Sequence, residues 1–435
     1  MNDHRQNVNK QLTVVNVRGQ ARLSGTVEVS AAKNSMLRLM VGSLLTEEEC
    51  VLYPYPKGML DAEILCGMLE VLGKKIVLTA DQSLSISEEQ HSKTELRWSK
   101  RSIRSTVLIA AALLARKGSA VVPNPGGCAI GDAGDGERKI DLHLMIFEKM
   151  GASYYYEDGY LILEAPSGLK GAEIHLPIRS TGATESAILA GTLAQGTTTI
   201  WGPHVRPEII DLMEFLRSMG AKIEVYGQER IVIHGVPALK GAVHRCIPDN
   251  VEALSWVVAS AVTGGDIEIH NFPTEHLEVP LIHMREAGVR LFIERDTAIV
   301  RLSRCQPLDI ATGPYPGINS DMQPLFAAMA AHARGESRIV DLRFPGRYQY
   351  AQQFERLGVK VEIVGNMLKI NGGMPLKGAE VVATDLRAGI ALLIAGLGAS
   401  GMTSIREAWQ IERGYDGIWE KLKQLGAVID LDYGS

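Results

Sequence analysis

The chain of 435 residues has few cysteines, and their spacing holds neither a metal nor a disulfide framework. The five cysteines are scattered at positions 50, 66, 128, 246 and 305, without a CxxC pair. This pattern excludes the usual zinc sites and disulfide scaffolds, so we expect no metal. Reduced thiols of this kind fit a cytoplasmic protein.

Long hydrophobic runs and an excess of positive charge are missing as well. No apolar run approaches the roughly 18 residues needed to span a bilayer, and 107-VLIAAALLA-115 is typical of a buried helix. The net charge of −5 argues against a nucleic-acid binder that relies on a broad basic surface. The polar start MNDHRQNVNK has no hydrophobic signal-peptide segment. We therefore expect a cytoplasmic protein whose partners include neither nucleic acid nor membrane.

Common catalytic motifs are absent too. The chain has no Ser/His/Asp order, no Walker loop and no HExxH, and 126-GGCAIG-131 is too short and misplaced for a dinucleotide fingerprint. We expect no cofactor.

A segment made of an apolar residue, Gly and a short strand recurs six times. The six glycines stand 68 to 78 residues apart, at positions 73, 151, 220, 288, 358 and 426. Gly after a helix is the usual left-handed stop, and strand-forming residues follow each of these glycines. Recurrence at a fixed period predicts six units, each a strand–helix–strand–helix–strand–strand, over nearly the whole chain.

One unit is longer than the others. From turn glycine to helix-ending glycine there are 33 residues in 118–151, but 23 to 25 in the four later units. The extra residues coincide with 123-PNPGGCAIGDAGDGERK-139, and long loops inside compact repeats are usually functional or disordered. Cys128 therefore stands on an insertion in a regular scaffold, whereas the other four cysteines fall in strand or helix patterns.

Basic residues stand at the junctions of strands and helices, where loops converge. They are Lys33, Arg104, Arg347, Arg387 and Arg413. Helix N-termini add N–H groups and partial positive charge, and Arg offers a two-pronged contact to phosphate or carboxylate. The set favours a small substrate with several negative charges.

Two acids precede apolar helices, Asp321 in 316-PGINSDMQPLF-326 and Asp385 in 384-TDLRAG-389. From the residues alone, an N-cap is the preferred interpretation of Asp321 and fits Asp385 as well.

The motifs PGGCAIG with DLH, 33-KN-34, 318-INSDMQ-323, 384-TDLRAG-389 and 412-ERGY-415 closely resemble those of the UDP-N-acetylglucosamine enolpyruvyl transferases (1-carboxyvinyltransferases), of the EPSP synthase-like superfamily. The resemblance runs from about residue 25 to residue 430. It implies an α/β fold, a two-domain inside-out α/β barrel whose domains hold three βαβαββ repeats each, six in all. We expect one domain at 34–247, with the Cys128 loop, and the other at 1–33 plus 248–435. The N-terminal strands should then pair with the last units.

The resemblance also implies a reaction, in which the enolpyruvyl group of phosphoenolpyruvate moves to the 3-hydroxyl of UDP-N-acetylglucosamine and phosphate leaves. This is the first committed step of peptidoglycan synthesis, and it requires no cofactor. The implied catalytic residues are Cys128, Asp321, Lys33 and Arg413. Cys128 is the mobile-loop cysteine that fosfomycin alkylates, and Asp321 is the candidate base. The implied substrate-binding residues are Asn34, Arg104, Arg138, Asp141, Leu142, Arg347, Asp385 and Arg387.

The departures from the family pattern cluster near the acceptor and the lid. Five residues are inserted after GCAIG, Lys139 replaces a proline, and Gly346 stands where an acid or amide is usual. Alternatives therefore stay open: a paralogue that uses another uridine nucleotide such as UMP, a shikimate-type acceptor, or a catalytically silent regulatory homologue. The charge state of Cys128 is open as well, because nearby acids favour the thiol and nearby bases the thiolate.

Overall fold

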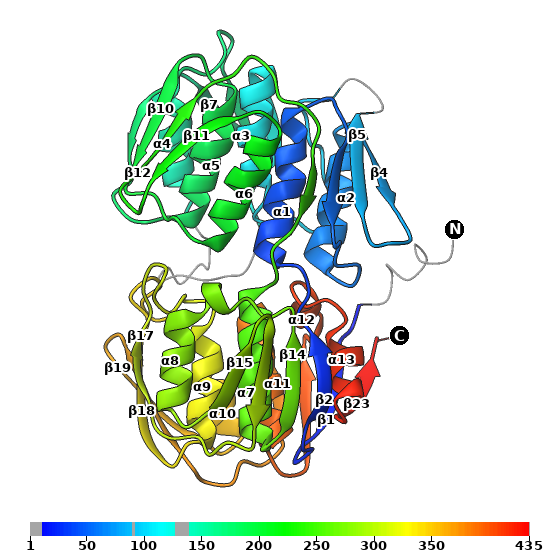
Figure 1. The fold of residues 1–435 in the computed structure, drawn as a ribbon, viewed down its shortest axis with the longest axis vertical. Coiled ribbons are helices and arrows are strands. Elements are labelled where there is room, and N and C mark those ends of the chain that lie inside the picture. Colours follow the sequence, from blue (N-terminus) through cyan, green and yellow to red (C-terminus); the bar gives the residue numbers. More distant parts are fainter. Residues whose placement is uncertain (1–10, 89–91, 127–138, 435) are drawn as a thin grey trace. The chain divides into compact units, whose positions relative to one another are not determined.

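The computed structural model describes residues 11–88, 92–126 and 139–434, which form two compact units (Figure 1). Unit 1 comprises residues 11–30 and 248–434, and unit 2 comprises residues 31–126 and 139–247. The chain passes between the units after Ser30 and after Ile247, where the sequence led us to expect residues 33 and 247.

The described part of unit 2 holds three sheets, and one of them takes a strand, β13, from the far end of the unit. The strands are β3 (Cys50–Tyr53), β4 (Lys74–Leu78), β5 (Leu84–Glu88), β6 (Ser119–Pro123), β7 (Ser153–Glu157), β8 (Tyr160–Glu164), β9 (Glu173–His175), β10 (Thr197–Trp201), β11 (Lys222–Tyr226), β12 (Arg230–His234) and β13 (Val243–Arg245). The sheet orders are β13-β3-β5-β4, β11-β12-β10-β9 and β6-β8-β7. In the last sheet, Glu95 adds a parallel bridge to Val121 of β6.

Unit 1 repeats the pattern. Its strands are β1 (Val14–Arg18), β2 (Ser24–Glu28), β14 (Asp266–His270), β15 (Arg290–Glu294), β16 (Thr297–Arg301), β17 (Asp309–Ala311), β18 (Gly335–Val340), β19 (Lys360–Val364), β20 (Met367–Gly372), β21 (Glu380–Val382), β22 (Met402–Arg406) and β23 (Val428–Asp432). The sheet orders are β15-β16-β14-β2, β17-β18-β20-β19 and β21-β22-β1-β23. Each of these sheets joins one parallel pair to antiparallel strands.

The N-terminal strands complete two sheets whose other strands come from later parts of the chain. Strand β1 lies between β22 and β23 and is antiparallel to both, with Val15 opposite Ile405 and Leu431. Strand β2 runs parallel to β14. The expected pairing with the last repeats is therefore seen for β1, whereas β2 pairs with β14, which follows soon after the chain returns to unit 1.

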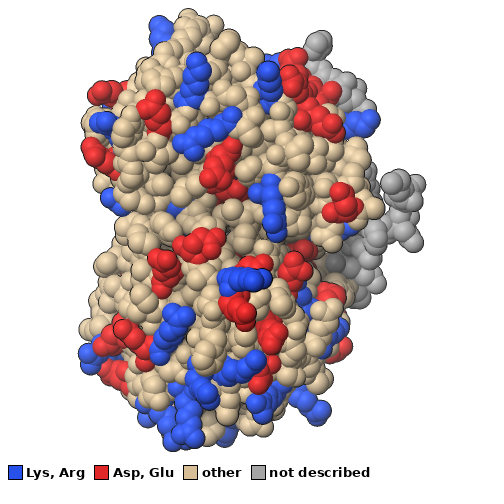
Figure 2. Space-filling model, in the orientation of Figure 1, with Lys and Arg blue, Asp and Glu red and all other residues tan. Residues whose placement is uncertain are grey.

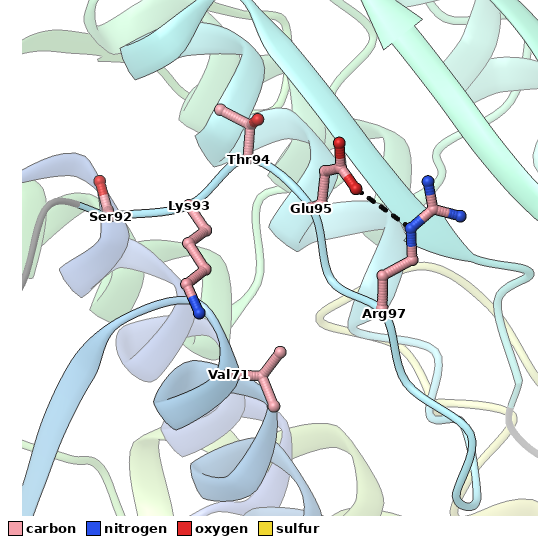
Figure 3. A pocket seen from close by; sticks show the side chains of 6 residues that line it. All are labelled: Val71, Ser92, Lys93, Thr94, Glu95 and Arg97. Carbon is pink, nitrogen blue, oxygen red and sulfur yellow. Dashed lines mark hydrogen bonds and ion pairs between the residues drawn. The ribbon is translucent and has the colours of Figure 1, made fainter.

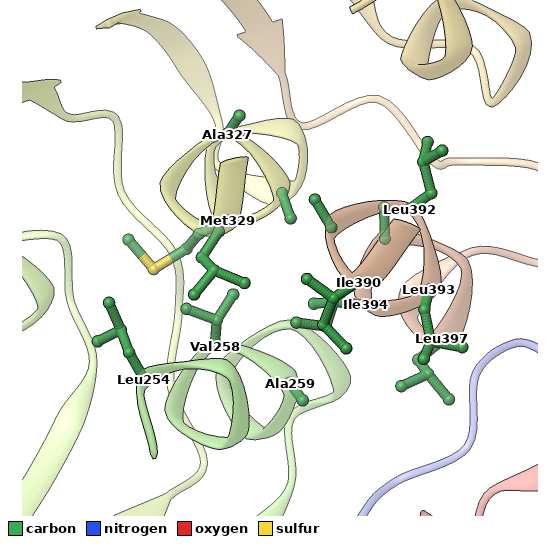
Figure 4. Packing of buried hydrophobic residues seen from close by; sticks show 14 of the residues in the cluster. Leu254, Val258, Ala259, Ala327, Met329, Ile390, Leu392, Leu393, Ile394 and Leu397 are labelled. Atoms are coloured by element: carbon green, nitrogen blue, oxygen red, sulfur yellow. The ribbon is translucent and has the colours of Figure 1, made fainter. Parts of the chain in front are cut away.

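The helices divide between the two units, and the most buried ones form the centre of each unit. Those of unit 2 are α1 (Lys33–Gly42), α2 (Leu60–Val71), α3 (Thr106–Lys117), α4 (Asp141–Lys149), α5 (Thr181–Thr192) and α6 (Pro207–Ser218), with the 3₁₀ turn η2 (Ser43–Leu45). Those of unit 1 are α7 (Asn250–Thr263), α8 (Glu278–Glu286), α9 (Gln323–His332), α10 (Ala351–Arg356), α11 (Leu386–Gly398), α12 (Trp409–Glu412) and α13 (Ile418–Gln424), with η3 (Thr274–His276). In unit 1, α7, α9 and α11 are buried on nearly every side and pack against one another. Figure 4 shows Val258 and Ile390 pointing into the space between these helices. In unit 2, α3 and α5 pack together in the same way and α1 joins them.

The helix-ending glycines have the backbone that the repeat predicts. All six of them, at positions 73, 151, 220, 288, 358 and 426, have φ between 88° and 105°. A side chain at such φ is strained, which explains why Gly recurs there. No helix of the described residues is long and apolar enough to cross a membrane.

His332, in the last turn of α9, lies against Gly398 of α11, where an added Cβ would approach the ring to 2.4 Å. Burial lowers the pKa of this imidazole from 6.5 to about 4, although a hydrogen bond with the backbone of Ala395 opposes the shift. Because the folded pKa lies below the unfolded one, protonation favours the unfolded chain. Stability should therefore fall as pH drops from about 6.5 towards 4.

We predict that His332→Gln removes this pH dependence. Between pH 7 and pH 5 the parent should lose about 2 kcal/mol of unfolding free energy through this one group, and the variant should not. Urea denaturation at both pH values measures the difference, with the exposed His270→Gln as control. An equal loss in the parent and both variants would contradict the assignment.

Candidate active site

Helix α11 is capped by an acid, Asp385, that fixes the position of a nearby arginine. The carboxylate of Asp385 accepts hydrogen bonds from the backbone N–H groups of Arg387 (2.7 Å) and Ala388 (3.2 Å). These are the bonds of an N-cap, which Asp forms well. The capping interpretation of Asp385 is confirmed, and it fixes Arg387 in the first turn of the helix.

Asp321 lies between two guanidinium groups. Its Oδ1 accepts a hydrogen bond from Nη1 of Arg347 at 3.1 Å, and its Oδ2 accepts one from Nη2 of Arg387 at 3.4 Å. The Asp321 side chain is 27% exposed, whereas those of Arg347 and Arg387 are only 3% and 5% exposed. The carboxylate is thus oriented by two buried cations and still open to a ligand.

The N-cap interpretation of Asp321 is wrong. Helix α9 begins at Gln323 after the N-cap residue Met322, and no side chain caps it. The backbone N–H of Asp321 donates instead to Oδ1 of Asn319 at 3.0 Å. The Asp321 carboxylate points to the arginines and not to the helix end.

Arg347 is buried in the segment between β18 and α10. Its Nη1 also donates to the carbonyl (3.2 Å) and the hydroxyl (3.0 Å) of Ser320. Burial alone would lower the pKa of this guanidinium, but the carboxylates of Asp321, Asp385 and Asp341 outweigh burial and raise the pKa above its ordinary value. Arg347 is therefore a permanent buried cation.

Arg387 is held from a second side by an aromatic ring. Its guanidinium lies 6.0 Å from the ring centroid of Tyr415, within the range of a cation–π contact. The Tyr415 and Ser255 hydroxyls are 2.9 Å apart. Burial raises the pKa of Tyr415 to about 12, so the ring is neutral.

Arg413 follows α12, a short helix that the sequence did not lead us to expect. Its Nη1 donates to Oε1 of Gln410 at 3.0 Å, and its guanidinium lies 6.0 Å from the ring of Trp409. The residue is buried and precedes Tyr415 by two positions, so it belongs to the segment that supports Arg387.

In unit 2, Lys33 is the first residue of α1, as the sequence predicts, and Asn34 is the second. The Lys33 ammonium forms an ion pair of 2.7 Å with Asp61 of α2, and both side chains are at most 8% exposed. Asp61 was not among the expected site residues. Its partner is 28 positions away, and it looks like an ordinary acid in the first turn of a helix.

Arg104 and the start of α4 are joined through one backbone group. Nη2 of Arg104 donates to the carbonyl of Lys139 at 2.7 Å, two residues before α4. Asp141, the first residue of α4, is exposed and Leu142 is partly buried. Cys128 and Arg138, the other expected residues of this part of the chain, lie outside the described residues.

The remaining cysteines are placed less regularly than expected. Cys50 lies in β3 and Cys66 in α2, but Cys246 and Cys305 lie in irregular segments, because β13 ends at Arg245 and β17 starts only at Asp309. Burial raises the pKa of the Cys66 and Cys305 thiols to about 11 and also raises that of Cys50. All three are poor nucleophiles at neutral pH.

A surface pocket of unit 2 lies apart from these residues. Val71 at the end of α2, residues 92–95 and Arg97 line it (Figure 3). Its polar groups include the exposed ion pair between Glu95 and Arg97, with an N–O distance of 3.1 Å. Exposed ion pairs of this kind contribute little to stability. We assign no role to it.

The charges on the face seen in Figure 2 are mixed, with acidic and basic side chains interspersed over both units. Among the described residues, no group of three or more His, Cys, Asp or Glu side chains could hold a metal ion.

Comparison with known proteins places these residues in a family. The sequence profile of EPSP synthase (3-phosphoshikimate 1-carboxyvinyltransferase) matches residues 17–422. The UDP-N-acetylglucosamine 1-carboxyvinyltransferase of Zymomonas mobilis is 38% identical over 425 residues, which cover 96% of this chain and 98% of that protein. The enzyme of the same name from Caulobacter vibrioides is 39% identical over 417 residues, 94% of this chain and 96% of that protein.

Solved structures show the same fold. The enolpyruvyl transferase NikO from Streptomyces tendae superposes with a TM-score of 0.85 at 24% identity, covering 98% of this chain and all of that chain. An EPSP synthase from Acinetobacter baumannii superposes with a TM-score of 0.70 at 19% identity, covering 97% of this chain and all of that chain. The expected two-domain α/β fold is confirmed.

We predict that the Lys33–Asp61 pair is a major support of unit 2. Asp61→Asn leaves a buried ammonium without its carboxylate, and such a loss costs about 3 kcal/mol of unfolding free energy. Chemical denaturation measures it, with Glu63→Gln as control, since Glu63 is an exposed acid of the same helix turn. Similar small losses in both variants would show that Lys33 does not depend on Asp61.

Proposed function

Since this chain belongs to the EPSP synthase family of enolpyruvyl transferases, we propose that it transfers the enolpyruvyl group of phosphoenolpyruvate to the 3-hydroxyl of UDP-N-acetylglucosamine. Phosphate is the second product, and the reaction is the first committed step of peptidoglycan synthesis. The acceptor follows from relatives of that name at 38% and 39% identity over nearly the whole chain. The observation that carries the chemistry is the Asp321 carboxylate held between two buried arginines.

The reaction is an addition followed by an elimination. The acceptor oxygen bonds to C2 of phosphoenolpyruvate while C3 gains a proton, which gives a tetrahedral ketal phosphate. C3 then loses a proton, the bond from C2 to the phosphate oxygen breaks, and the double bond returns. The acceptor hydroxyl must lose its proton in the first step, so the site needs a base and an acid.

The roles of the residues follow from these needs. Asp321 accepts the proton of the hydroxyl, because its carboxylate is fixed and partly exposed. Lys33, Arg104, Arg387 and Arg413 bind the carboxylate and phosphate of phosphoenolpyruvate and stabilise the charge that shifts between them. Cys128 supplies a proton to C3 from the inserted loop.

The remaining expected residues bind the acceptor or support the site. Asn34 contacts the sugar, while Arg138, Asp141 and Leu142 hold the uridine diphosphate. Arg347 and Asp385 keep Asp321 and Arg387 in position, a role that fits their hydrogen bonds. No step requires a cofactor.

Another uridine nucleotide is the second candidate acceptor. The five residues inserted after the GCAIG motif bring in Asp132 and Asp135, in the segment that the family resemblance assigns to the nucleotide site. Their charge disfavours a diphosphate unless Arg138 and Lys139 compensate, and UMP carries only one phosphate.

Phosphate release tests the proposal. The enzyme is incubated with phosphoenolpyruvate and, in separate reactions, with UDP-N-acetylglucosamine, UMP, 3-phosphoshikimate or no acceptor. We expect phosphate release only in the reaction whose acceptor is UDP-N-acetylglucosamine. Release with UMP alone would assign the paralogue, and a chain silent with every acceptor would be a binding or regulatory homologue.

We predict that Arg387→Ala lowers the efficiency with phosphoenolpyruvate far more than it weakens binding of the nucleotide. The loss of a charge-assisted contact to a buried anion costs about 2–5 kcal/mol, so kcat/KM for phosphoenolpyruvate should fall by at least about 30-fold. The dissociation constant of the nucleotide sugar should stay within about threefold of the parent's. Arg356→Ala is the control, because Arg356 is exposed at the end of α10 and donates a hydrogen bond to the carbonyl of Glu380, away from Asp321. An equal loss for both ligands would make Arg387 a structural residue.

A further inference from the structure

We propose that Ser320 and Asp341 are positioning residues, which fix the Arg347 guanidinium and, through it, the Asp321 carboxylate. The inference rests on the proposed function, since it assigns a support to the base of that reaction. Neither residue is among those that the sequence singled out, and both are buried. The evidence is one chain of hydrogen bonds within unit 1.

The chain of hydrogen bonds has only one possible direction. Nη1 of Arg347 can only donate, so the Ser320 hydroxyl oxygen must accept from it at 3.0 Å. The Ser320 hydroxyl is then free to donate to Asp341, and the hydrogen bond from Oγ of Ser320 to Oδ2 of Asp341 measures 2.5 Å. A carboxylate at position 341 therefore sets the orientation of the hydroxyl that Arg347 contacts.

Asp341 is a fixed point from which this chain starts. It is fully buried, and its Oδ1 accepts hydrogen bonds of 2.9 Å from the hydroxyl of Thr312 and the backbone N–H groups of Arg343 and Phe344. Its own N–H donates to the Tyr348 hydroxyl at 2.8 Å. Three donors on Oδ1 leave Oδ2 with one direction, towards Ser320.

The other end of the chain is the candidate base. Ser320 precedes Asp321, and Nη1 of Arg347 contacts both residues. The bond from Ser320 to Asp341 is not needed to close the turn at 341–344, which Oδ1 already holds. Its effect falls on the dipeptide that carries the Asp321 carboxylate.

The second amino group of Arg347 supports the same conclusion. Its Nη2 is buried and has no hydrogen-bond partner among the described residues, a costly state for a charged group. Because Nη1 is fixed on three acceptors, Nη2 has a fixed direction too. Such a donor is suited to an acceptor that arrives with a ligand, and its aim depends on Ser320 and Asp341.

Two substitutions break the chain of hydrogen bonds with little change of shape. Ser320→Ala removes the bridging hydroxyl. Asp341→Asn is nearly isosteric, but the three donors on Oδ1 hold the amide oxygen there, so the amide N–H₂ faces Ser320 and leaves its proton without an acceptor. A misplacement of about 1 Å at a reacting group costs about 100-fold in rate. We expect each variant to lower kcat by about 10- to 100-fold.

A matched control separates positioning from stability. Ser337 of β18 is fully buried, and its hydroxyl accepts a hydrogen bond from the N–H of Leu308 at 3.1 Å. Ser337→Ala therefore removes one buried serine hydroxyl from the same unit without touching Arg347. It should lower the unfolding midpoint about as much as Ser320→Ala does, and its kcat should stay within about twofold of the parent's.

The experiment measures kcat, KM for phosphoenolpyruvate, the dissociation constant of the nucleotide and the unfolding midpoint for the parent, the three variants and the Ser320→Ala/Asp341→Asn pair. The effects of two substitutions in the same chain of hydrogen bonds should not add, so the double variant should lose no more kcat than the worse single variant. We expect the loss in kcat, with nucleotide binding unchanged. Losses that multiply, or equal activity of Ser320→Ala and Ser337→Ala, would overturn the positioning role. A parent that releases no phosphate with any acceptor would overturn the proposed function instead, before any variant is compared.

Discussion

The central helices of each unit are apolar on almost every side, and the rest of the structure follows from the need to bury them. A helix of this kind is stable only when other elements surround it completely. In unit 1, α7, α9 and α11 bury one another, and the sheets that enclose them use strands from both ends of the chain. A single repeat cannot enclose its own apolar helix, which explains why each unit contains three repeats.

This packing brings the starts of the helices together. Asp321 precedes α9 and Arg387 opens α11, and their side chains are in contact. Tyr415, which supports Arg387, bonds Ser255 in the first half of α7. Three helices thus run in the same direction and present their N-terminal ends at one place. Helix N-termini attract anions, so the site for an anionic substrate is a product of the core packing.

The sequence predicts the parts of this arrangement that depend on local signals. The helix-ending glycines recur at a fixed period because each needs positive φ, and they located all six units. Lys33 and Arg387 were also found from local signals, because each stands in the first turn of a helix. By contrast, Asp61 and Asp341 were missed, because their roles depend on partners 28 and 21 positions away, Lys33 and Ser320. A buried acid has no mark in a single sequence until the fold shows what it contacts.

The error over Asp321 has a physical cause that the sequence did contain. Asp249 and Asp385 precede α7 and α11, and each caps its helix by accepting from the N–H groups two and three residues later. At the equivalent place before α9, the residue three after Asp321 is Pro324, which has no N–H to donate. Half of the cap is therefore impossible, and α9 starts without one, at a cost of about 1 kcal/mol. The carboxylate released from capping is the one that Arg347 and Arg387 hold, so the repeat loses stability at the place where its chemistry is proposed.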